Sequence, residues 1–295
     1  MQEISTSYLE NSKVKRAKKR TRLSFSFNHI VLYMALLVLL ILLAFALVPG
    51  LIAPFEPVDM QKDRLLLPPS IEHFFGTDYF GRDVFTLVVY GSRTSLIIGI
   101  VVVIISAIVG TLIGAIAGYV GGTVDRILMR IIEIIQIIPG MLLALALAAV
   151  LGASFFNLVI AISIAAIPGY ARVMRGQIIS IKHRPFITAA ESIGTSKWAI
   201  FFKHILPNAY APLLVIATNG LGTAILTGAA LSFLGLGVVS EIPDWGTLLS
   251  QGRNYIAAAW WIATFPGLAI ALFVLAVNII GDQLRDVFDP KKKIV

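Results

Sequence analysis

The side chains that could carry out chemistry are few and scattered in this sequence. Its four histidines stand at positions 29, 73, 183 and 204, a spacing that forms no set of metal ligands, and cysteine is absent. The sequence contains no G-x-x-x-x-G-K-[ST] phosphate loop, no H-E-x-x-H zinc motif and no G-x-S-x-G nucleophile motif. It therefore predicts a chain that is not an enzyme and has no cofactor or metal site of its own.

The polar residues within the apolar segments favour helix packing over proton transfer. Glu133 and Asp282 are expected near the cytoplasmic ends of helices, and Glu133 is expected to pair with a nearby arginine. A carrier coupled to protons or sodium usually places ionisable groups at mid-depth. Here the mid-segment polar residues are neutral, and hydrogen bonds between helices are favoured over substrate contact. These residues are Asn157, Asn219, Thr227 and Asn278.

The composition is that of a membrane protein. Hydrophobic residues make up 58% of the 295 residues, charged residues only 14%, and the mean hydropathy is +0.88. The formal net charge of +8 lies mostly beside the apolar segments. Positive charge at these places sets orientation in a membrane, so nucleic-acid binding is not expected.

Six apolar stretches predict an all-α, multi-pass membrane protein. Six spans put both termini on one side. That side carries 19 of the 24 Lys and Arg residues, so the positive-inside rule places the termini in the cytoplasm. The predicted spans are residues 30–48, 96–119, 127–151, 156–174, 209–237 and 256–280. Between the first two lies a Pro-rich loop, in which residues 78–90 are expected to form a short surface helix.

Glycine and proline are placed in patterns within these spans. Gly110, Gly114 and Gly118 recur every fourth residue, which predicts a strip where another helix can pack closely. Proline is followed by glycine inside three other spans. These pairs suit either ordinary kinks or hinges for alternating access, and we favour hinges. The prolines are Pro139, Pro168 and Pro266.

Residues 181–208 form a polar, basic segment between two apolar stretches. Pro185 suits the first turn of a short helix, and an apolar face follows at i, i+3, i+4 and i+7. Gly194 permits a sharp turn, and a second helix is expected to end at Pro207. The segment is either an interfacial helix that rests on lipid headgroups or a docking element for a soluble protein. The expected apolar face comprises Phe186, Ala189, Ala190 and Ile193.

This segment resembles the EAA loop of the membrane subunits of bacterial ABC importers. The pattern E-A-A-x-x-x-G followed by I-x-L-P is matched by Ala189, Ala190, Gly194 and Leu206-Pro207. The resemblance implies a coupling helix that inserts into a cleft of an ATPase subunit. The leading Glu of the family is Thr188 here, so Glu191 is a candidate to replace its contact.

Further blocks are similar to the dipeptide/oligopeptide/nickel permease family, on the side of its C-type subunits. They are GTDYFGRDVFTLVVYGSRTSL (76–96), LSFLGLG (231–237), PDWG (243–246) and GDQLRDVFDP (281–290). The resemblance implies a type I importer fold with six transmembrane helices. It also implies a division into a basic N-terminal segment (1–28), a first helix and extracytoplasmic loop (29–92), a core (93–282) and a tail (283–295).

The same resemblance implies the partners and the cargo. The partners are a homologous second permease subunit, two ATPase subunits that hold ATP and Mg²⁺, an extracytoplasmic substrate-binding protein and membrane lipid. The expected cargo is di- or oligopeptides, with nickel, metallophores or glutathione as alternatives within the family. An ion-coupled secondary transporter and a membrane scaffold that only recruits a soluble protein remain alternatives from other classes.

Overall fold

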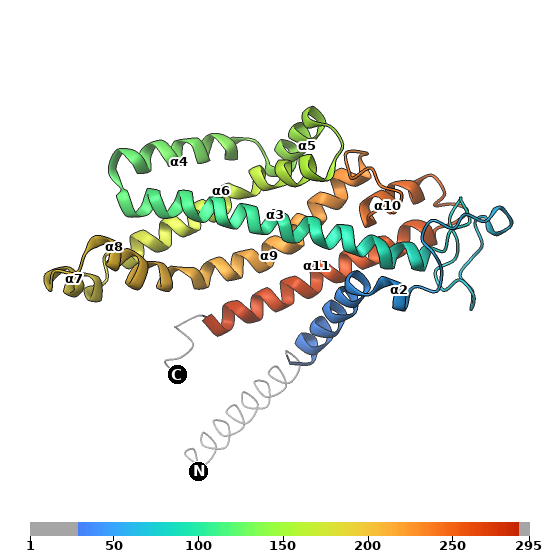
Figure 1. The fold of residues 1–295 in the computed structure, drawn as a ribbon, viewed down its shortest axis with the longest axis horizontal. Coiled ribbons are helices and arrows are strands. Elements are labelled where there is room, and N and C mark those ends of the chain that lie inside the picture. The colour runs from blue at the N-terminus through green and yellow to red at the C-terminus, as the bar shows by residue number, and fades with distance from the viewer. Residues whose placement is uncertain (1–28, 289–295) are drawn as a thin grey trace, which may run out of the picture.

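The computed structural model describes residues 29–288, and this part of the chain is built of helices joined by short connections. The long helices lie roughly side by side in an elongated bundle (Figure 1). The first helix is His29–Leu47. It is followed by α2 (Pro49–Ile52), the short 3-10 helix η1 (Lys62–Arg64), α3 (Val84–Val120), α4 (Gly122–Ile137), α5 (Gly140–Leu151), α6 (Phe155–Lys182), α7 (Pro185–Ser192), α8 (Lys197–Ala199), the π-helix η2 (Ile200–Ile205), α9 (Leu206–Phe233), α10 (Trp245–Arg253) and α11 (Trp261–Phe288).

Five helical stretches of the described chain are long and apolar enough to cross a membrane. They are His29–Leu47, α3, α6, the continuous helix Lys197–Phe233 and α11. The sixth expected span is bent by 85° between α4 and α5, where Pro139 follows Ile138. Counted as one broken span, this pair completes six, so the predicted all-α multi-pass fold is confirmed.

The start of α3 differs from the sequence prediction. No helix covers residues 78–83; a tight turn lies there, with an isolated bridge between Thr77 and Asp83. Asp78 holds this turn because its Oδ1 accepts hydrogen bonds from the backbone N–H groups of Phe80 (2.8 Å) and Arg82 (2.9 Å). The carboxylate of Asp83 then caps the first turn by accepting from the Thr86 N–H, and a single helix of 37 residues follows.

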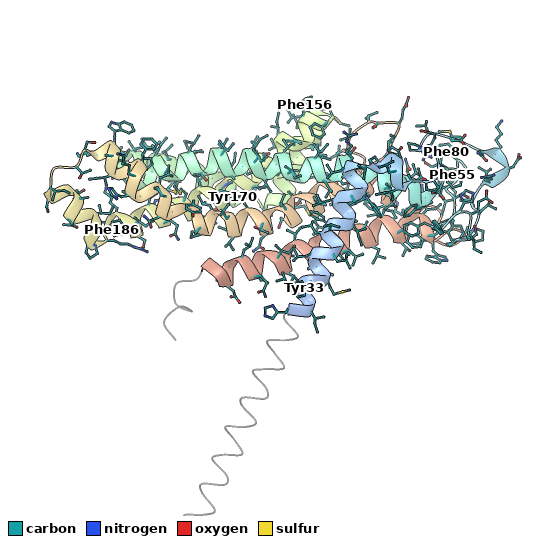
Figure 2. The ribbon with its side chains drawn as sticks, turned by 60° about the horizontal axis from the view of Figure 1, so that its bottom comes forward. Tyr33, Phe55, Phe80, Phe156, Tyr170 and Phe186 are labelled. Carbon is teal, nitrogen blue, oxygen red and sulfur yellow. The ribbon has the colours of Figure 1, made fainter. Side chains whose placement is uncertain are left out.

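Buried side chains form three clusters along the length of the bundle. The first surrounds Trp245 near the 53–83 loop, the second lies where α3, α5, α6 and α9 meet, and the third lies beside α7. Figure 2 shows Phe186 at one end of the bundle, Phe55 and Phe80 at the other, and Tyr170 between them. The two ends are called below the α7 end and the opposite end.

Candidate functional site

The 181–208 loop forms a short helix that continues from the end of α6. Arg184 is the N-cap of α7, and Pro185 occupies its first turn. The N–H that proline lacks would have no partner within the helix at this position. The side chains of Ile187 and Ala190 are buried in the third cluster, against Ile178 of α6 and Ile205 of η2. The helix is therefore fixed to the bundle along one face.

The outward face of α7 differs from the face expected from the sequence. Phe186 is 41% exposed and Ile193 is 83% exposed, and Ala189 lies exposed between them. Ala190 is only 8% exposed, because it faces the bundle together with Ile187. Of the two alanines, only Ala189 can present a surface to a partner in this conformation.

The turn after α7 requires glycine because of its backbone. Gly194 has a φ of +79°, a left-handed conformation that side chains disfavour. The N–H of Thr195 donates to the carbonyl of Ala190 (3.1 Å), and the N–H of Gly194 donates to Glu191 (3.0 Å). No atom lies within 4 Å of a β-carbon built at Gly194, so the space beside the turn is open.

The second helix of the loop does not end at Pro207. Residues Ile200–Ile205 form a π-helix that runs directly into α9, and Pro207 lies in the first turn of α9. The missing N–H of proline is tolerated there, so the expected break is absent. Trp198 and Phe202 stack on the outside of this turn, with ring centroids 5.9 Å apart and exposures of 74% and 55%.

Tyr119 and Lys182 fasten the loop to the end of α3. The Tyr119 hydroxyl donates to the carbonyl of Lys197 (2.7 Å), and its ring contacts that of Phe201 at 4.8 Å. The Lys182 ammonium donates to the Tyr119 carbonyl (3.0 Å). A movement of the loop is therefore transmitted to α3 as well as to α6 and α9.

An ion pair joins α4 to α6 near the same end. The guanidinium of Arg175 donates to both carboxylate oxygens of Asp125, at 2.5 Å and 2.7 Å. Bidentate pairs of this kind are more directional than single contacts. Ile132 is the one buried residue of α4, so the ion pair also helps to hold this helix in position.

The glycine strip of α3 packs within this chain. β-Carbons built at Gly110 and Gly118 would lie 2.6 Å from Tyr170 Cβ and 2.9 Å from Ile178 Cβ of α6. Gly114, between them, faces Ala171 and Met174 of the same helix. The strip is therefore covered by α6 rather than left open for another subunit.

The three Pro-Gly pairs have different local structures. Pro139 is the N-cap of α5 at the 85° break, whereas Pro168 and Pro266 lie inside α6 and α11, each of which continues as one helix. Gly140, after the break, has no atom nearer than 3.9 Å to a built β-carbon, so the helices there are loosely packed.

A cavity of about 360 Å³ lies beside this break, between α3, α5, α6 and α9. Its walls are mainly apolar with a few neutral polar groups. The buried Oδ1 of Asn219 has no hydrogen-bond partner among the described residues, so the expected bond between helices is not made. The polar lining residues are Ser106, Tyr170, Asn219, Thr223 and Thr227.

The position of Glu133 also differs from the prediction. It lies eleven residues into α4, or about 16 Å from the start of the helix, and not at its end. It does pair with an arginine, Arg130, at 3.3 Å, although both side chains are exposed. Glu133, Gln136 and Arg172 line a second pocket of about 470 Å³ that the sequence analysis missed. No sequence signal could locate this pocket, because it depends on the bend at Pro139.

The family-like blocks lie at the opposite end and act as structural joints. The indole N–H of Trp245 in PDWG donates to the carbonyl of Val88 in α3 (2.9 Å), and that of Trp261 donates to Thr77 (2.9 Å). The Oδ2 of Asp244 accepts from Ser232 in LSFLGLG (2.7 Å).

The charged and aromatic side chains of the turn at this end are also structural. The guanidinium Nε of Arg82 donates to Asp78 (2.8 Å), and both side chains are buried. Burial raises the pKa of Tyr79, with the nearby Arg82 acting in the opposite direction, so its phenol stays neutral. Among the described residues, no group of three or more acids, histidines or cysteines is placed to hold a metal ion.

Similar folds and sequences are found among ABC importers. Two crystal forms of the methionine ABC transporter MetNI, both in inward facing conformations, contain a chain of similar fold. Their TM-scores to this chain are 0.56 and 0.58, and their sequence identities are 19% and 20%. The second alignment covers 70% of this chain and 98% of that chain. At this identity the likeness shows the fold, and the predicted type I importer fold is confirmed.

Curated relatives are similar over most of the sequence. The dipeptide transport system permease protein DppC of Alkalihalophilus pseudofirmus is 46% identical over 250 residues, covering 82% of each chain. DppC of Escherichia coli is 47% identical over 264 residues, or 88% of each chain. The glutathione transport system permease protein GsiD of E. coli O1:K1 is 43% identical over 270 residues, covering 91% of this chain and 89% of its own.

The family described as "Binding-protein-dependent transport system inner membrane component" matches residues 110–294, which include the 181–208 loop and the cavity-lining residues of α5, α6 and α9 but not those of α3. With the close relatives above, this match identifies a non-catalytic membrane subunit. The chain belongs to the family of inner-membrane permease components of binding-protein-dependent ABC transporters.

Proposed function

We propose that this chain is a permease subunit of an ATP-driven importer that moves di- or oligopeptides across the cytoplasmic membrane. The observation that carries this proposal is the set of relatives named for dipeptide or di/tripeptide transport, at 42–47% identity over 82–88% of this chain. The cavity, with mainly apolar walls and a few neutral polar groups, suits a peptide better than a bare cation, since a cation needs charged or carbonyl ligands.

The α7 end is the proposed site of energy input. α7, with exposed Ala189, Glu191 and the turn at Gly194, enters a cleft of a separate ATPase subunit that holds ATP and Mg²⁺. Ala190 supports this surface from inside the bundle, and exposed Pro207 lies in the first turn of α9. ATP can drive a conformational change only if the contacts of α7 differ between the two states of the transporter.

The charge distribution supports a cytoplasmic location for this end. Of the 24 Lys and Arg residues, 19 lie in the terminal segments, the α3–α4 region and the 181–208 loop with its flank. The other side then faces an extracytoplasmic substrate-binding protein. A homologous second permease subunit completes the conduit, and two ATPase subunits lie beneath the pair.

The moving part of the core, residues 93–282, is proposed to be the region around the 360 Å³ cavity. The break at Pro139 is the strongest hinge candidate, since α4 and α5 are already separate helices there. Pro168 and Pro266 are weaker candidates because their helices continue. Gly110, Gly114 and Gly118 keep α3 and α6 together as one body during the movement.

Glutathione transport is the second candidate function. The relative that supports it is GsiD, with 43% identity over 270 residues. Glutathione is itself a tripeptide, so the same cavity suits both cargoes.

Uptake in a strain that lacks this gene tests the proposal. We expect the loss of labelled dipeptide uptake, and restoration by the wild-type gene but not by a vector. A longer peptide, glutathione and Ni²⁺ are measured in parallel. Loss of glutathione uptake alone would select the second candidate, and loss of Ni²⁺ uptake with normal peptide uptake would contradict the peptide assignment.

A further inference from the structure

The second pocket combines opposite charges in one place. Its volume is about 470 Å³, within the range of roughly 300–1,000 Å³ typical of small-molecule sites. Glu133 and Gln136 come from α4, and Arg172 comes from α6. The pocket exists because α4 turns away at Pro139, which leaves these polar side chains facing an opening rather than a helix.

The pocket adjoins the 360 Å³ cavity on the side of the α7 end. Gly140 and Ala165 line both spaces, so the two are adjacent at the break. Arg172 follows Tyr170 of the cavity by two residues along α6, in the direction of α7. A molecule that leaves the cavity towards the α7 end therefore meets this pocket next.

Arg172 lines the pocket and has no partner among the described residues. It is exposed, and it makes no hydrogen bond or ion pair with any residue in the range 29–288. Among the described residues, Glu133 forms an ion pair with Arg130 of its own helix, in an exposed pair of the kind that contributes little, and its charge also interacts with that of Arg175. An ionisable side chain beside a transport pathway is expected to have a functional partner.

We propose that Arg172, Glu133 and Gln136 form a transient binding site for zwitterionic peptides on their way out of the cavity. The guanidinium of Arg172 takes the terminal carboxylate, for which its planar fork is suited. The carboxylate of Glu133 takes the terminal ammonium, and the amide of Gln136 bonds the peptide group between them. This inference rests on the proposed peptide function and adds the residues that read the charged ends.

Such a site lowers the barrier to transport only while it binds weakly. In a conduit, binding must be strong enough to attract the cargo and weak enough to release it. Solvent-exposed charges meet this condition, because water and salt screen them. A neutral cavity followed by a charged pocket thus gives the peptide an exit site for its own charged ends.

The test uses the complete transporter, purified and reconstituted in vesicles with its ATPase subunits and binding protein. Arg172→Gln is compared with Arg172→Lys and Glu133→Gln. Arg126→Gln is the matched control, since Arg126 is an exposed arginine of α4 outside both pockets. The readouts are subunit composition, ATP hydrolysis and ATP-driven uptake of a labelled dipeptide.

We expect R172Q to reduce dipeptide uptake about tenfold while composition and basal ATP hydrolysis stay normal. A tenfold reduction corresponds to about 1.4 kcal/mol, close to the low end of what a hydrogen bond to a charged group contributes. R172K should retain part of the uptake, E133Q should reduce it less than R172Q, and R126Q should equal wild type.

Two results would overturn the inference while leaving the proposed function intact. One is normal dipeptide uptake by R172Q. The other is loss of the second permease subunit from purified R172Q, which would make Arg172 a subunit contact. A wild-type transporter that takes up no peptide would instead overturn the proposed function, and this inference with it.

Cysteine labelling gives an independent readout of occupancy. The chain has no native cysteine, so a thiol reagent on Gln136→Cys reports on this pocket alone within the chain. We expect a dipeptide under turnover with ATP to slow labelling of Q136C, measured by mass spectrometry, but not labelling of Ser180→Cys on the exposed surface of α6. Equal labelling of Q136C with and without dipeptide would contradict the proposed site.

Discussion

At the scale of single residues, Trp245 is held by hydrogen bonds in the first buried cluster, near the 53–83 loop. Trp245 is fully buried, its indole N–H bonds Val88, and its backbone N–H donates to Ser95 (3.1 Å). Trp260, by contrast, is 51% exposed. The family-like PDWG block therefore serves stability, since it joins α10 to α3.

Trp245→Phe is expected to lower the melting temperature of the purified transporter. The change removes the indole donor to the Val88 carbonyl and opens a gap, at a cost of about 1–3 kcal/mol. Trp260→Phe makes the same chemical change at an exposed site and should have little effect. Equal melting temperatures for the two variants, measured in detergent by intrinsic fluorescence, would contradict the structural role of Trp245.

At the scale of elements, α7 has one face buried against the bundle and one exposed face, called here the fastened face and the free face. Ala189→Arg places a long charged side chain on the free face, where the bundle offers no clash. We expect this variant to reach the membrane in normal amounts and to lose peptide uptake, because its side chain obstructs docking in the ATPase cleft.

The control for Ala189→Arg is Ser180→Arg, an equal charge on the exposed surface of α6. This variant should transport normally. Membrane content is measured by immunoblot and uptake with a labelled dipeptide. Wild-type uptake by A189R would remove the coupling role from α7.

The contact between α3 and α6 gives a second prediction at this scale. A β-carbon at Gly114 would lie 2.9 Å from Met174 Cβ, whereas one at Gly176 would meet no atom within 4 Å. Both glycines lie inside helices, so replacement by alanine gains about 1 kcal/mol of helix propensity at each.

Gly114→Ala is therefore expected to lower the melting temperature of the transporter, because overpacking costs about 1–3 kcal/mol. Gly176→Ala should leave it unchanged or raise it. A Gly114→Ala variant as stable as Gly176→Ala would show that α6 yields at this contact and that close packing is not needed there.

The sequence predicted elements well where apolar length or a strong breaker decides. The spans and the turn at Gly194 follow from hydropathy and from glycine, and the structure contains both. The sequence prediction was wrong where local hydrogen bonds decide the backbone conformation. Asp78 turns the chain instead of starting a helix, and the helix of η2 runs on into α9 through Pro207. The second pocket depends on how α4 packs on α6, which no local pattern encodes.

At the scale of the whole molecule, this chain has a conduit and a docking element but no energy source of its own. Its sequence contains no phosphate loop, and its family is one of transporter membrane subunits. The purified chain alone is therefore expected to hydrolyse no ATP. Measurable hydrolysis that persists in the pure chain would contradict the division of labour proposed above.

The most direct test of the central claim is peptide accumulation by the complete transporter in sealed vesicles. The account predicts that labelled dipeptide accumulates only with Mg-ATP and the binding protein, and that A189R abolishes this accumulation. Accumulation without ATP, driven by a proton gradient and lost with an uncoupler, would contradict it and would make the chain part of a secondary transporter.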